Sequence, residues 1–408
     1  MSVESEATGR ARRGPSPFAF LGAAQFLSQF GDSVFQIAFI WLLLELTGSK
    51  SATGFAATVS YLPALLFGVF AGFLVDRWNR QRVLVAADAA RALLLAAGGG
   101  LFAAGALGAP GLTAIAFGCA TAAVLFNPAR DSLLPSLVPA SWLIQANAWV
   151  QTSQQAAYLI GPLCAGVIVQ GLGIGAVFPA GVALYIGSMI LLFGVGRAGG
   201  APVSKAERPH ALQDFREGLR AIAADRTLLL LLAFTGIDNL FIMGPAVVGT
   251  AVMVRETLGG DAAMYALVEA TYGLGWGLGS LLIGRLAARV PYGILLLVGI
   301  TLDGLTYVPL LWCRSLPYLL VVSLIHSMVI PLITVPRAAL VQRIVPAARL
   351  GRVFALVNVV VIGMTSLSSG LTGMALEFVD APMLFGVIGA LAGLTGIAGF
   401  ASKRLRTL

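Results

Sequence analysis

The sequence predicts an all-helical polytopic membrane protein, with twelve transmembrane helices arranged as two pseudo-symmetric six-helix bundles. Three observations predict this class. The composition is 58% hydrophobic with a mean hydropathy of +0.91, far above the roughly half-apolar composition of soluble domains. Apolar windows long enough to cross a bilayer recur along the chain. Positive charges alternate between the loops that separate these windows.

Each crossing needs about 20 mostly apolar residues. Twelve windows meet this requirement, at residues 18–46, 52–75, 83–105, 110–129, 142–170, 173–196, 227–254, 262–284, 292–313, 316–335, 352–376 and 381–401. The first window is too long for the apolar core of a signal peptide, so we expect the preceding residues to be retained.

The distribution of Lys and Arg predicts the orientation. Of the 26 Lys and Arg residues, only Lys50, Arg255 and Arg314 fall in loops of the opposite side, and Arg91 lies within a window. The others, Arg337 among them, fall in the termini or in the loops after even-numbered windows. Because cytoplasmic loops carry the excess of Lys and Arg, we expect a multi-pass protein of the cell inner membrane with both termini cytoplasmic.

The domain organisation follows from the longest polar segment, which divides the windows into two sets of six. We expect a cytoplasmic tail at 1–17, a six-helix bundle at 18–196, a cytoplasmic linker at 197–226, a second bundle at 227–401 and a tail at 402–408. Apolar residues at helical spacing in the linker, Leu212, Phe215, Leu219 and Ile222, predict an amphipathic helix. Asp32-Ser33-Val34-Phe35 and Asp238-Asn239-Leu240-Phe241 occupy equivalent places in the two halves, as in the internal repeats of carriers.

The loop after the second window is unusually charged. Residues 72–84 read Gly-Phe-Leu-Val-Asp-Arg-Trp-Asn-Arg-Gln-Arg-Val-Leu, although only 11% of the chain is charged. Gly72 allows close approach of a neighbouring helix. Asp76 can pair with Arg77, Arg80 and Arg82, or face the N-terminus of another helix. We interpret this loop as a latch between helices that can open, and its arginines also act as orientation signals.

The same loop resembles the signature of the major facilitator superfamily, Gly-x-Leu-x-Asp-Arg-x-Gly-Arg-Arg/Lys. The matching residues are Gly72, Leu74, Asp76, Arg77 and Arg80. Asn79 replaces the loop glycine, and Asn tolerates the left-handed conformation better than most residues. The resemblance implies the major facilitator fold and a latch on the cytoplasmic side. Because the second half has Gly284 where the first has Asp76, we expect Asp76→Ala to slow transport more than any substitution at Gly284.

Further segments resemble the branch of this superfamily that includes macrolide-efflux and enterobactin-exporter relatives. These segments are Gly31-Asp32, Leu46-Thr47-Gly48-Ser49, Pro128-Ala129-Arg130 and Leu143-x-x-Ala146-Asn147. Gly161-Pro162-Leu163-Cys164-Ala165-Gly166 is similar to the Gly-Pro-x-x-Gly-Gly motif of proton-coupled exporters, with Ala165 in place of a glycine. Gly161, Pro162 and Gly166 would also permit a packing kink in the fifth helix.

Polar residues at helical spacing predict where substrate and protons bind. Lipid disfavours polar faces within a span, so such faces must line protein or water. The candidates are Gln25, Gln29, Asp32 and Gln36 in the first window, Gln151, Gln154, Gln155 and Tyr158 in the fifth, Thr235, Asp238 and Asn239 in the seventh, and Asn358, Thr365 and Ser369 in the eleventh.

Four carboxylates lie within the windows, on Asp32, Asp238, Glu269 and Asp303. A low dielectric disfavours a charged carboxylate, which suits proton binding and release. We favour Asp32 and Asp238 for proton coupling or for pairing with a cationic substrate, against a purely structural role. Glu269 and Asp303 could instead lie near outer helix ends or pair at a helix interface.

Two other titratable groups lie within the windows. Asp88 and Arg91 are three residues apart, so they can pair with each other or with the latch. We interpret His326 as a packing histidine, because no motif surrounds it.

The sequence thus favours proton-coupled export of a drug, antibiotic or siderophore-like molecule by a monomeric carrier. The proton gradient would supply the energy, with no cofactor or metal. Gly48-Ser49-Lys50-Ser51 lacks the glycine that an ATP-binding loop needs before lysine. The glycines between 273 and 279 follow no predicted strand, which argues against a dinucleotide-binding loop. No soluble basic face suggests nucleic acid. An importer of the same fold remains an alternative; a membrane enzyme is less favoured.

Overall fold

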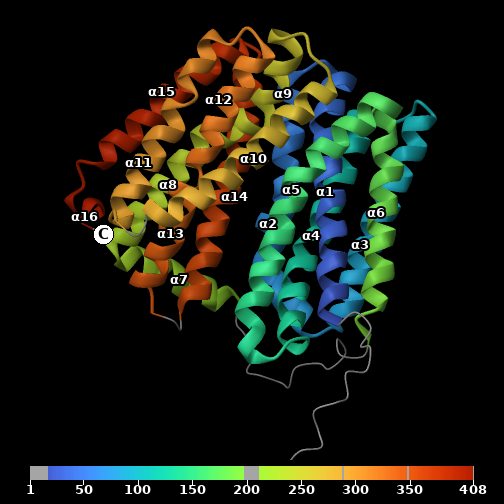
Figure 1. The fold of residues 1–408 in the computed structure, drawn as a ribbon, viewed down its shortest axis with the longest axis horizontal. Helices are drawn as coiled ribbons and strands as arrows, with labels where there is room; N and C mark the ends of the chain where they lie inside the picture. The colour runs from blue at the N-terminus through green and yellow to red at the C-terminus, as the bar shows by residue number, and fades with distance from the viewer. Residues whose placement is uncertain (1–16, 197–210, 287–288, 347–348, 408) are drawn as a thin grey trace, which may run out of the picture.

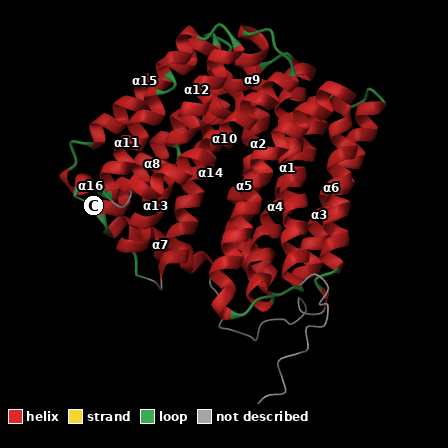
Figure 2. Ribbon diagram, viewed as in Figure 1, coloured by secondary structure: helices red, strands yellow, loops and turns green. Residues whose placement is uncertain are grey.

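The computed structural model describes residues 17–196, 211–286, 289–346 and 349–407, and every regular element in these ranges is helical (Figure 2). Twelve helical segments are long and apolar enough to cross a membrane. Figure 1 shows two bundles side by side. The N-bundle comprises α1 to α6 and the C-bundle comprises α8 to α15. The predicted all-helical class with twelve spans is therefore confirmed.

The N-bundle has six continuous helices, α1 (Pro17–Thr47), α2 (Lys50–Asp76), α3 (Arg80–Ala103), α4 (Ala109–Leu133), α5 (Leu143–Leu172) and α6 (Val177–Phe193). Gly48 makes the tight turn between α1 and α2 with φ of +60°, a conformation that glycine adopts without steric cost. Ser49 then caps α2, because its side chain accepts a hydrogen bond from the backbone N–H of Ala52.

The turn between α2 and α3 differs from the expectation for Asn79. Its φ is −67°, an extended and not a left-handed conformation. The Asn79 side chain accepts a hydrogen bond from the Arg82 backbone N–H at 3.1 Å and so caps α3. Asn79 therefore acts as a helix-capping residue, and its tolerance of positive φ is not used.

The C-bundle contains α8 (Arg226–Gly244), α9 (Thr250–Val252), α10 (Ala262–Leu286), α11 (Tyr292–Leu305), α12 (Leu316–Val329), α13 (Pro331–Ile344), α14 (Leu350–Ala375) and α15 (Ala381–Gly399), followed by the short α16 (Lys403–Arg406). Two π-helical segments, Pro245–Gly249 and Met253–Thr257, flank α9 within the seventh span. Pro245 has no N–H to donate, which favours a departure from α-helical geometry there.

The tenth span corrects one predicted boundary. The sequence places Arg337 in the loop after this span, but α13 continues to Ile344, and the span covers Leu316–Ile344. Arg337 lies close enough to Asp238 of α8 to interact with its charge. An arginine within a span needs such a partner.

The linker segment contains α7 (Ala211–Ala224), and the side chains of residues 211–215 are not described. Ile222 is buried, whereas Leu219 is 52% exposed. On α7, Glu217 pairs with Arg352 of α14 at 2.6 Å. We call the end of the molecule that carries α7 and the start of α1 the linker end, and the opposite end the far end.

The closest contacts between the bundles lie toward the far end. Lys50 of α2 donates to the Leu376 carbonyl oxygen at 3.1 Å, and Thr58 donates to the Ser366 carbonyl oxygen at 2.8 Å. Trp41 of α1 stacks on Tyr265 of α10 with ring centroids 6.1 Å apart. Toward the linker end the ribbons of the two bundles diverge (Figure 1). The structure is therefore closed at the far end.

Candidate functional site

A buried ion cluster in the N-bundle is the main polar feature of that half. We call Asp32, Asp88 and Arg91 the Arg91 cluster. The Arg91 side chain is fully buried, and its Nη1 donates to both carboxylate oxygens of Asp32 at 2.9 and 2.8 Å. Its Nη2 lies 2.8 Å from Asp88 Oδ1, one turn away on α3. One cation therefore holds two carboxylates from two helices.

Hydroxyl groups complete the coordination of these carboxylates. Ser28 of α1 and Ser188 of α6 donate to the two oxygens of Asp88 at 2.9 and 2.6 Å. Tyr185 of α6 donates to Asp32 Oδ1 at 2.7 Å, and its ring centroid lies 5.0 Å from the guanidinium. A buried charge is tolerable only with such paired and hydrogen-bonded surroundings.

The two carboxylates of the Arg91 cluster differ in access. The Asp88 side chain is fully buried, whereas the Asp32 side chain is 28% exposed. Asp32 is therefore the carboxylate of this cluster that is open to its surroundings, whereas Asp88 is enclosed with Arg91. Tyr185 reaches Asp32 because Gly31 carries no side chain; a Cβ on Gly31 would lie 3.1 Å from the Tyr185 ring.

The predicted glutamine face of α1 divides along the helix. Gln25 and Gln29 are buried, and Gln25 donates to the Val150 carbonyl oxygen of α5 at 3.2 Å. Gln36 is exposed. Gln25 therefore fastens α1 to α5, and Gln36 is the glutamine of this face that is open to its surroundings.

The α5 candidates lie in the half of α5 nearer the linker end, and Tyr158 reaches the contact of α5 with Gly273 of α10. Gln151 is exposed, Gln154 and Gln155 are half-buried, and Tyr158 is 42% exposed. Asn358 of α14 is also exposed. Exposed polar side chains on both bundles at this depth suit a water-filled path toward the linker end.

The counterpart of Asp32 in the C-bundle has a different environment. Asp238 is 5% exposed, and its Oδ1 has no hydrogen-bond partner among the described residues. Asn239 donates to the Thr235 carbonyl oxygen of its own helix at 2.8 Å. Arg337 interacts with Asp238 electrostatically, without the two-oxygen contact that Arg91 makes. The two halves therefore place an aspartate at equivalent positions, but the groups around the two carboxylates differ.

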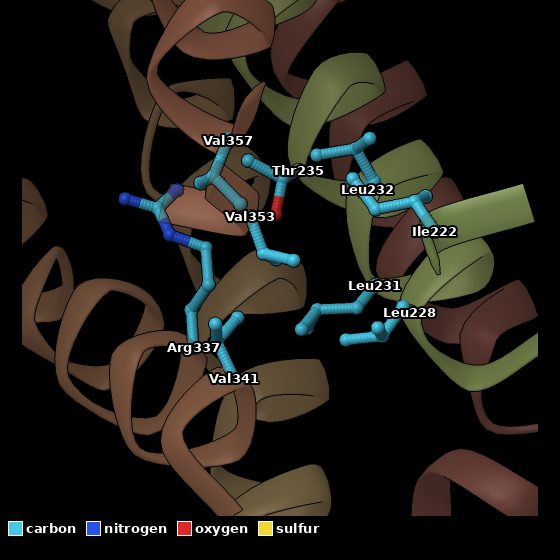
Figure 3. A pocket seen from close by; sticks show the side chains of 9 residues that line it. All are labelled: Ile222, Leu228, Leu231, Leu232, Thr235, Arg337, Val341, Val353 and Val357. Carbon is cyan, nitrogen blue, oxygen red and sulfur yellow. The ribbon is translucent and has the colours of Figure 1, made fainter. Parts of the chain in front are cut away.

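A small cavity lies beside this aspartate, between α7, α8, α13 and α14 (Figure 3). Its volume is about 10 Å³, enough for one water molecule and too small for a drug. The lining is aliphatic except for Thr235 and Arg337. The buried Thr235 hydroxyl has no partner among the described groups, so a water molecule there would satisfy it.

Glu269 lies on the face of α10 that meets α5. Ala266 and Gly273 share this face at helical spacing; a Cβ on Gly166 would lie 3.2 Å from Ala266 Cβ, and a Cβ on Gly273 would lie 3.0 Å from Leu159 Cα. Glu269 is half-buried between these two contacts. Its carboxylate interacts electrostatically with Tyr61 of α2, so it is placed between the bundles.

The fourth predicted carboxylate, Asp303 of α11, is buried beside His326 of α12, with 3.6 Å between Asp303 Oδ1 and His326 Nδ1. Of the two placements that the sequence left open, the structure shows the pairing at a helix interface. His326 therefore has a titratable neighbour that its sequence context did not reveal.

The predicted latch is described only in part. The side chain of Asp76 and the surroundings of Gly72 lie outside the described residues. Arg77 and Arg82 are exposed, and Arg80 is 6% exposed. Gln81 donates to the Leu192 carbonyl oxygen of α6 at 2.7 Å, so the start of α3 is fastened to α6.

The glycines of the fifth span allow close approach to two neighbours. A Cβ on Gly161 would collide with Ser33 of α1, and Gly166 faces α10. Pro162 lies inside α5, which is one helix from Leu143 to Leu172. These residues therefore set how closely α5 packs against its own bundle on one face and against the C-bundle on another.

Sequence reasoning missed the hydroxyl groups of the Arg91 cluster. Ser28, Tyr185 and Ser188 lie far from Arg91 in the chain, and serine or tyrosine in a span is common. Ser28 does lie on the α1 face of Gln25 and Asp32, four residues before the aspartate. Reading all polar residues of that face together would have included it.

Comparison with known proteins identifies the fold family. The family model described as Major Facilitator Superfamily matches residues 21–248, more than half of the chain. Macrolide efflux protein A of Streptococcus pyogenes is 25% identical over 357 residues, which cover 83% of this chain and 84% of that protein. Multidrug efflux pump Tap of Mycobacterium tuberculosis is 33% identical over 167 residues, 40% of this chain and 39% of that protein.

Solved structures show the same fold at low sequence identity. The nucleoside transporter NupG superposes with a TM-score of 0.79 at 10% identity, covering 95% of this chain and 99% of that chain. A bacterial homologue of the iron transporter ferroportin in its inward-facing state gives a TM-score of 0.75 at 15% identity, with 95% and 99% coverage.

Proposed function

The chain belongs to the major facilitator superfamily, and we propose that within it the protein is a proton-coupled exporter of a drug, antibiotic or siderophore-like molecule. It is a multi-pass membrane transporter of small molecules and not an enzyme. The names of its relatives, macrolide efflux protein A and multidrug efflux pump Tap, support export. The observation that carries proton coupling is the Arg91 cluster with its partly exposed Asp32.

The proposed cycle uses the difference between the two carboxylates of the cluster. With the site open to the outside, a proton binds the Asp32 carboxylate and weakens its hold on Arg91. Arg91 stays paired with Asp88 at 2.8 Å, so no buried cation is left alone. With the site open to the cytoplasm, Arg91 pairs with Asp32 again and the proton leaves to water. Substrate occupies the space between the bundles while Asp32 is deprotonated, and it leaves to the outside before the next proton binds.

The orientation belongs to the same proposal. The Lys and Arg distribution supports a cytoplasmic linker end in the inner membrane. In that orientation the structure, closed at its far end, is the inward-facing state, ready to accept substrate from the cytoplasm. We propose that one chain suffices, because each bundle supplies one wall of the site.

Accumulation of a radiolabelled macrolide in a drug-sensitive bacterial host tests the function and its direction. We expect cells that produce the protein to retain less macrolide than cells with an empty vector, and Asp32→Asn to remove the difference. Greater retention in producing cells would favour the importer. If a broad panel of antibiotics and siderophores gave no difference in either direction, the proposed export would be wrong.

A further inference from the structure

The C-bundle holds a second buried titratable pair, formed by Asp303 of α11 and His326 of α12. We call these two residues the C-bundle pair. Their side chains are 4% and 1% exposed, and Asp303 Oδ1 lies 3.6 Å from His326 Nδ1. The pair belongs to a different bundle from the Arg91 cluster, and the proposed cycle does not use it.

The hydrogen bonds around Thr306 indicate which nitrogen of His326 carries a proton. The Thr306 hydroxyl donates its single hydrogen to the Asp303 carbonyl oxygen at 2.9 Å. The same hydroxyl oxygen lies 2.8 Å from His326 Nδ1. Because the hydroxyl has no second hydrogen, we assign Nδ1 as the donor in that contact. His326 Nδ1 therefore carries a hydrogen on the side that faces Asp303.

Aromatic rings enclose the imidazole. His326 stacks on Tyr307 with ring centroids 4.0 Å apart and 21° between the planes. Tyr272 of α10 meets the imidazole edge-on at 5.6 Å, and the two tyrosine hydroxyls lie 3.0 Å apart. This enclosure keeps water from the imidazole, so the charge state of the pair depends on protein groups.

The described surroundings of the Asp303 carboxyl group do little to stabilise a negative charge. Its Oδ1 is buried without a hydrogen-bond partner among the described residues. The titratable groups that face it are Tyr272 of α10, Tyr307 of α11, His326 of α12 and Asp238 of α8.

None of these neighbours supplies a compensating charge when His326 is neutral, and Asp238 would add repulsion. From α15, the groups packed against this part of α11 are Phe385, Gly389 and Gly393, which do not titrate. A buried ionised carboxylate without a partner is strongly disfavoured. The pair must therefore hold a proton, and the neutral form of both residues avoids two buried charges.

We infer that Asp303, held beside neutral His326, is a second proton-carrying site of the transport cycle, in addition to Asp32. This inference rests on the proposed proton coupling. In the enclosed state Asp303 carries the proton as a carboxylic acid. When the bundle rearranges around it, the acid releases the proton to water and becomes a carboxylate. Thr306 and His326 are positioning residues, because they contact Asp303 and do not carry the transported proton themselves. Tyr272 and Tyr307 contact His326 through their rings and each other through their hydroxyls. Tyr272 also interacts electrostatically with Glu269 on α10, so these tyrosines lie between the pair and Glu269.

Spectroscopy of the purified wild-type protein tests the inference without transport. Infrared difference spectra at neutral pH should contain the C=O stretch of a protonated carboxyl group, which Asp303→Asn removes and Asp32→Asn retains. The chain has two histidines, so His210→Gln leaves one. In that variant, ¹⁵N-histidine NMR should show a neutral His326 protonated at Nδ1.

An ionised Asp303 at neutral pH would overturn the inference, whether His326 is neutral or an imidazolium. The NMR variant leaves both members of the pair intact, so an imidazolium signal from His326 would overturn the neutral pair even if Asp303→Asn failed to fold.

Transport by Asp303→Asn separates a coupling role from a structural one. Asn has nearly the shape of the protonated acid, so we expect the variant to keep counterflow exchange of substrate and to lose accumulation against a gradient. Asp303→Asn with full uphill transport would refute the coupling role. If the wild type itself showed no proton-driven transport, the proposed function would fail, while the spectra would still decide the protonation of Asp303.

Discussion

Arg91 determines whether the N-bundle can bury two carboxylates. It is fully buried, and it is in contact with Asp32 and Asp88 at hydrogen-bonding distance. Phe126 contacts the guanidinium, with its ring centroid 4.9 Å away, which favours a delocalised cation at this place. The stability of the bundle and its proton response therefore depend on one side chain.

Arg91→Met should destabilise the protein far more than Asp32→Asn. The first change leaves Asp88 buried without its cation, at a cost of about 3–5 kcal/mol, whereas the second leaves Arg91 paired with Asp88. Thermal unfolding in detergent measures both variants, and Arg91→Met combined with Asp32→Asn and Asp88→Asn should recover part of the loss. An Arg91→Met protein as stable as wild type would show that the cluster does not hold the bundle together.

At the scale of helices, α2 and α14 close the far end because Gly54 of α2 lets the two backbones approach closely. A Cβ on Gly54 would lie 2.6 Å from the Ser369 carbonyl oxygen and 2.8 Å from Gly373 Cα. Both neighbours are backbone atoms, which cannot move aside as a flexible side chain can. The two helices can therefore meet at this point only while position 54 is glycine.

Gly54→Ala should shift the protein away from the state that is closed at the far end. Gly68→Ala is the matched control on the same helix, since a Cβ there has no neighbour within 4 Å. Spin labels at the far ends of α2 and α14 measure the effect, and their mean separation should increase in Gly54→Ala only. Equal distance distributions in the two variants would contradict the closure that we describe.

Glu377, in the turn between α14 and α15, makes the same closure sensitive to pH. Its Oε1 accepts from the Ser51 backbone N–H at 2.9 Å and from the Ser49 hydroxyl at 3.1 Å. These hydrogen bonds, those from Ser51 first, lower the pKa of Glu377. Nearby, Lys50 of α2 pairs with Glu256 at 2.8 Å.

Acidic pH should therefore loosen the far end. The contact of Glu377 is complete while the carboxylate is ionised, and it is lost as the pH falls through the lowered pKa. We expect far-end spin-label distances to increase at acidic pH in the wild type. In Glu377→Gln the distances should not follow pH, because the amide oxygen accepts the same hydrogen bonds but does not titrate. A variant that still responded to pH as the wild type does would assign the response to another group.

At the scale of the whole molecule, the sequence predicts the membrane-spanning helices but not most of the side-chain contacts between them. Hydropathy reports which segments suit hydrocarbon, so the twelve spans and the two-bundle class could be predicted. The i, i+3 pair of Asp88 and Arg91 could also be predicted, because helix geometry brings those residues together. Asp32 is 59 residues from Arg91, and only the arrangement of α1 and α3 within the bundle reveals that contact.

The C-bundle shows the same limit. His326 had no motif around it, yet it lies beside Asp303 from another helix. The repeat of Asp32 and Asp238 predicted similar roles, but no described residue of the second half makes a two-oxygen contact with Asp238 like that of Arg91 with Asp32. Pseudo-symmetry in sequence therefore predicts where the backbone repeats, and does not predict that the chemistry repeats.

Uphill transport in inverted membrane vesicles tests the central claim of proton-coupled export most directly. A fluorescent or radiolabelled macrolide should accumulate inside vesicles whose interior is acidified, and the accumulation should stop when an ionophore collapses the proton gradient. Vesicles with Asp32→Asn plus Asp238→Asn should show no accumulation. Accumulation that persists without the gradient, or that is intact in the double variant, would contradict proton coupling through these aspartates.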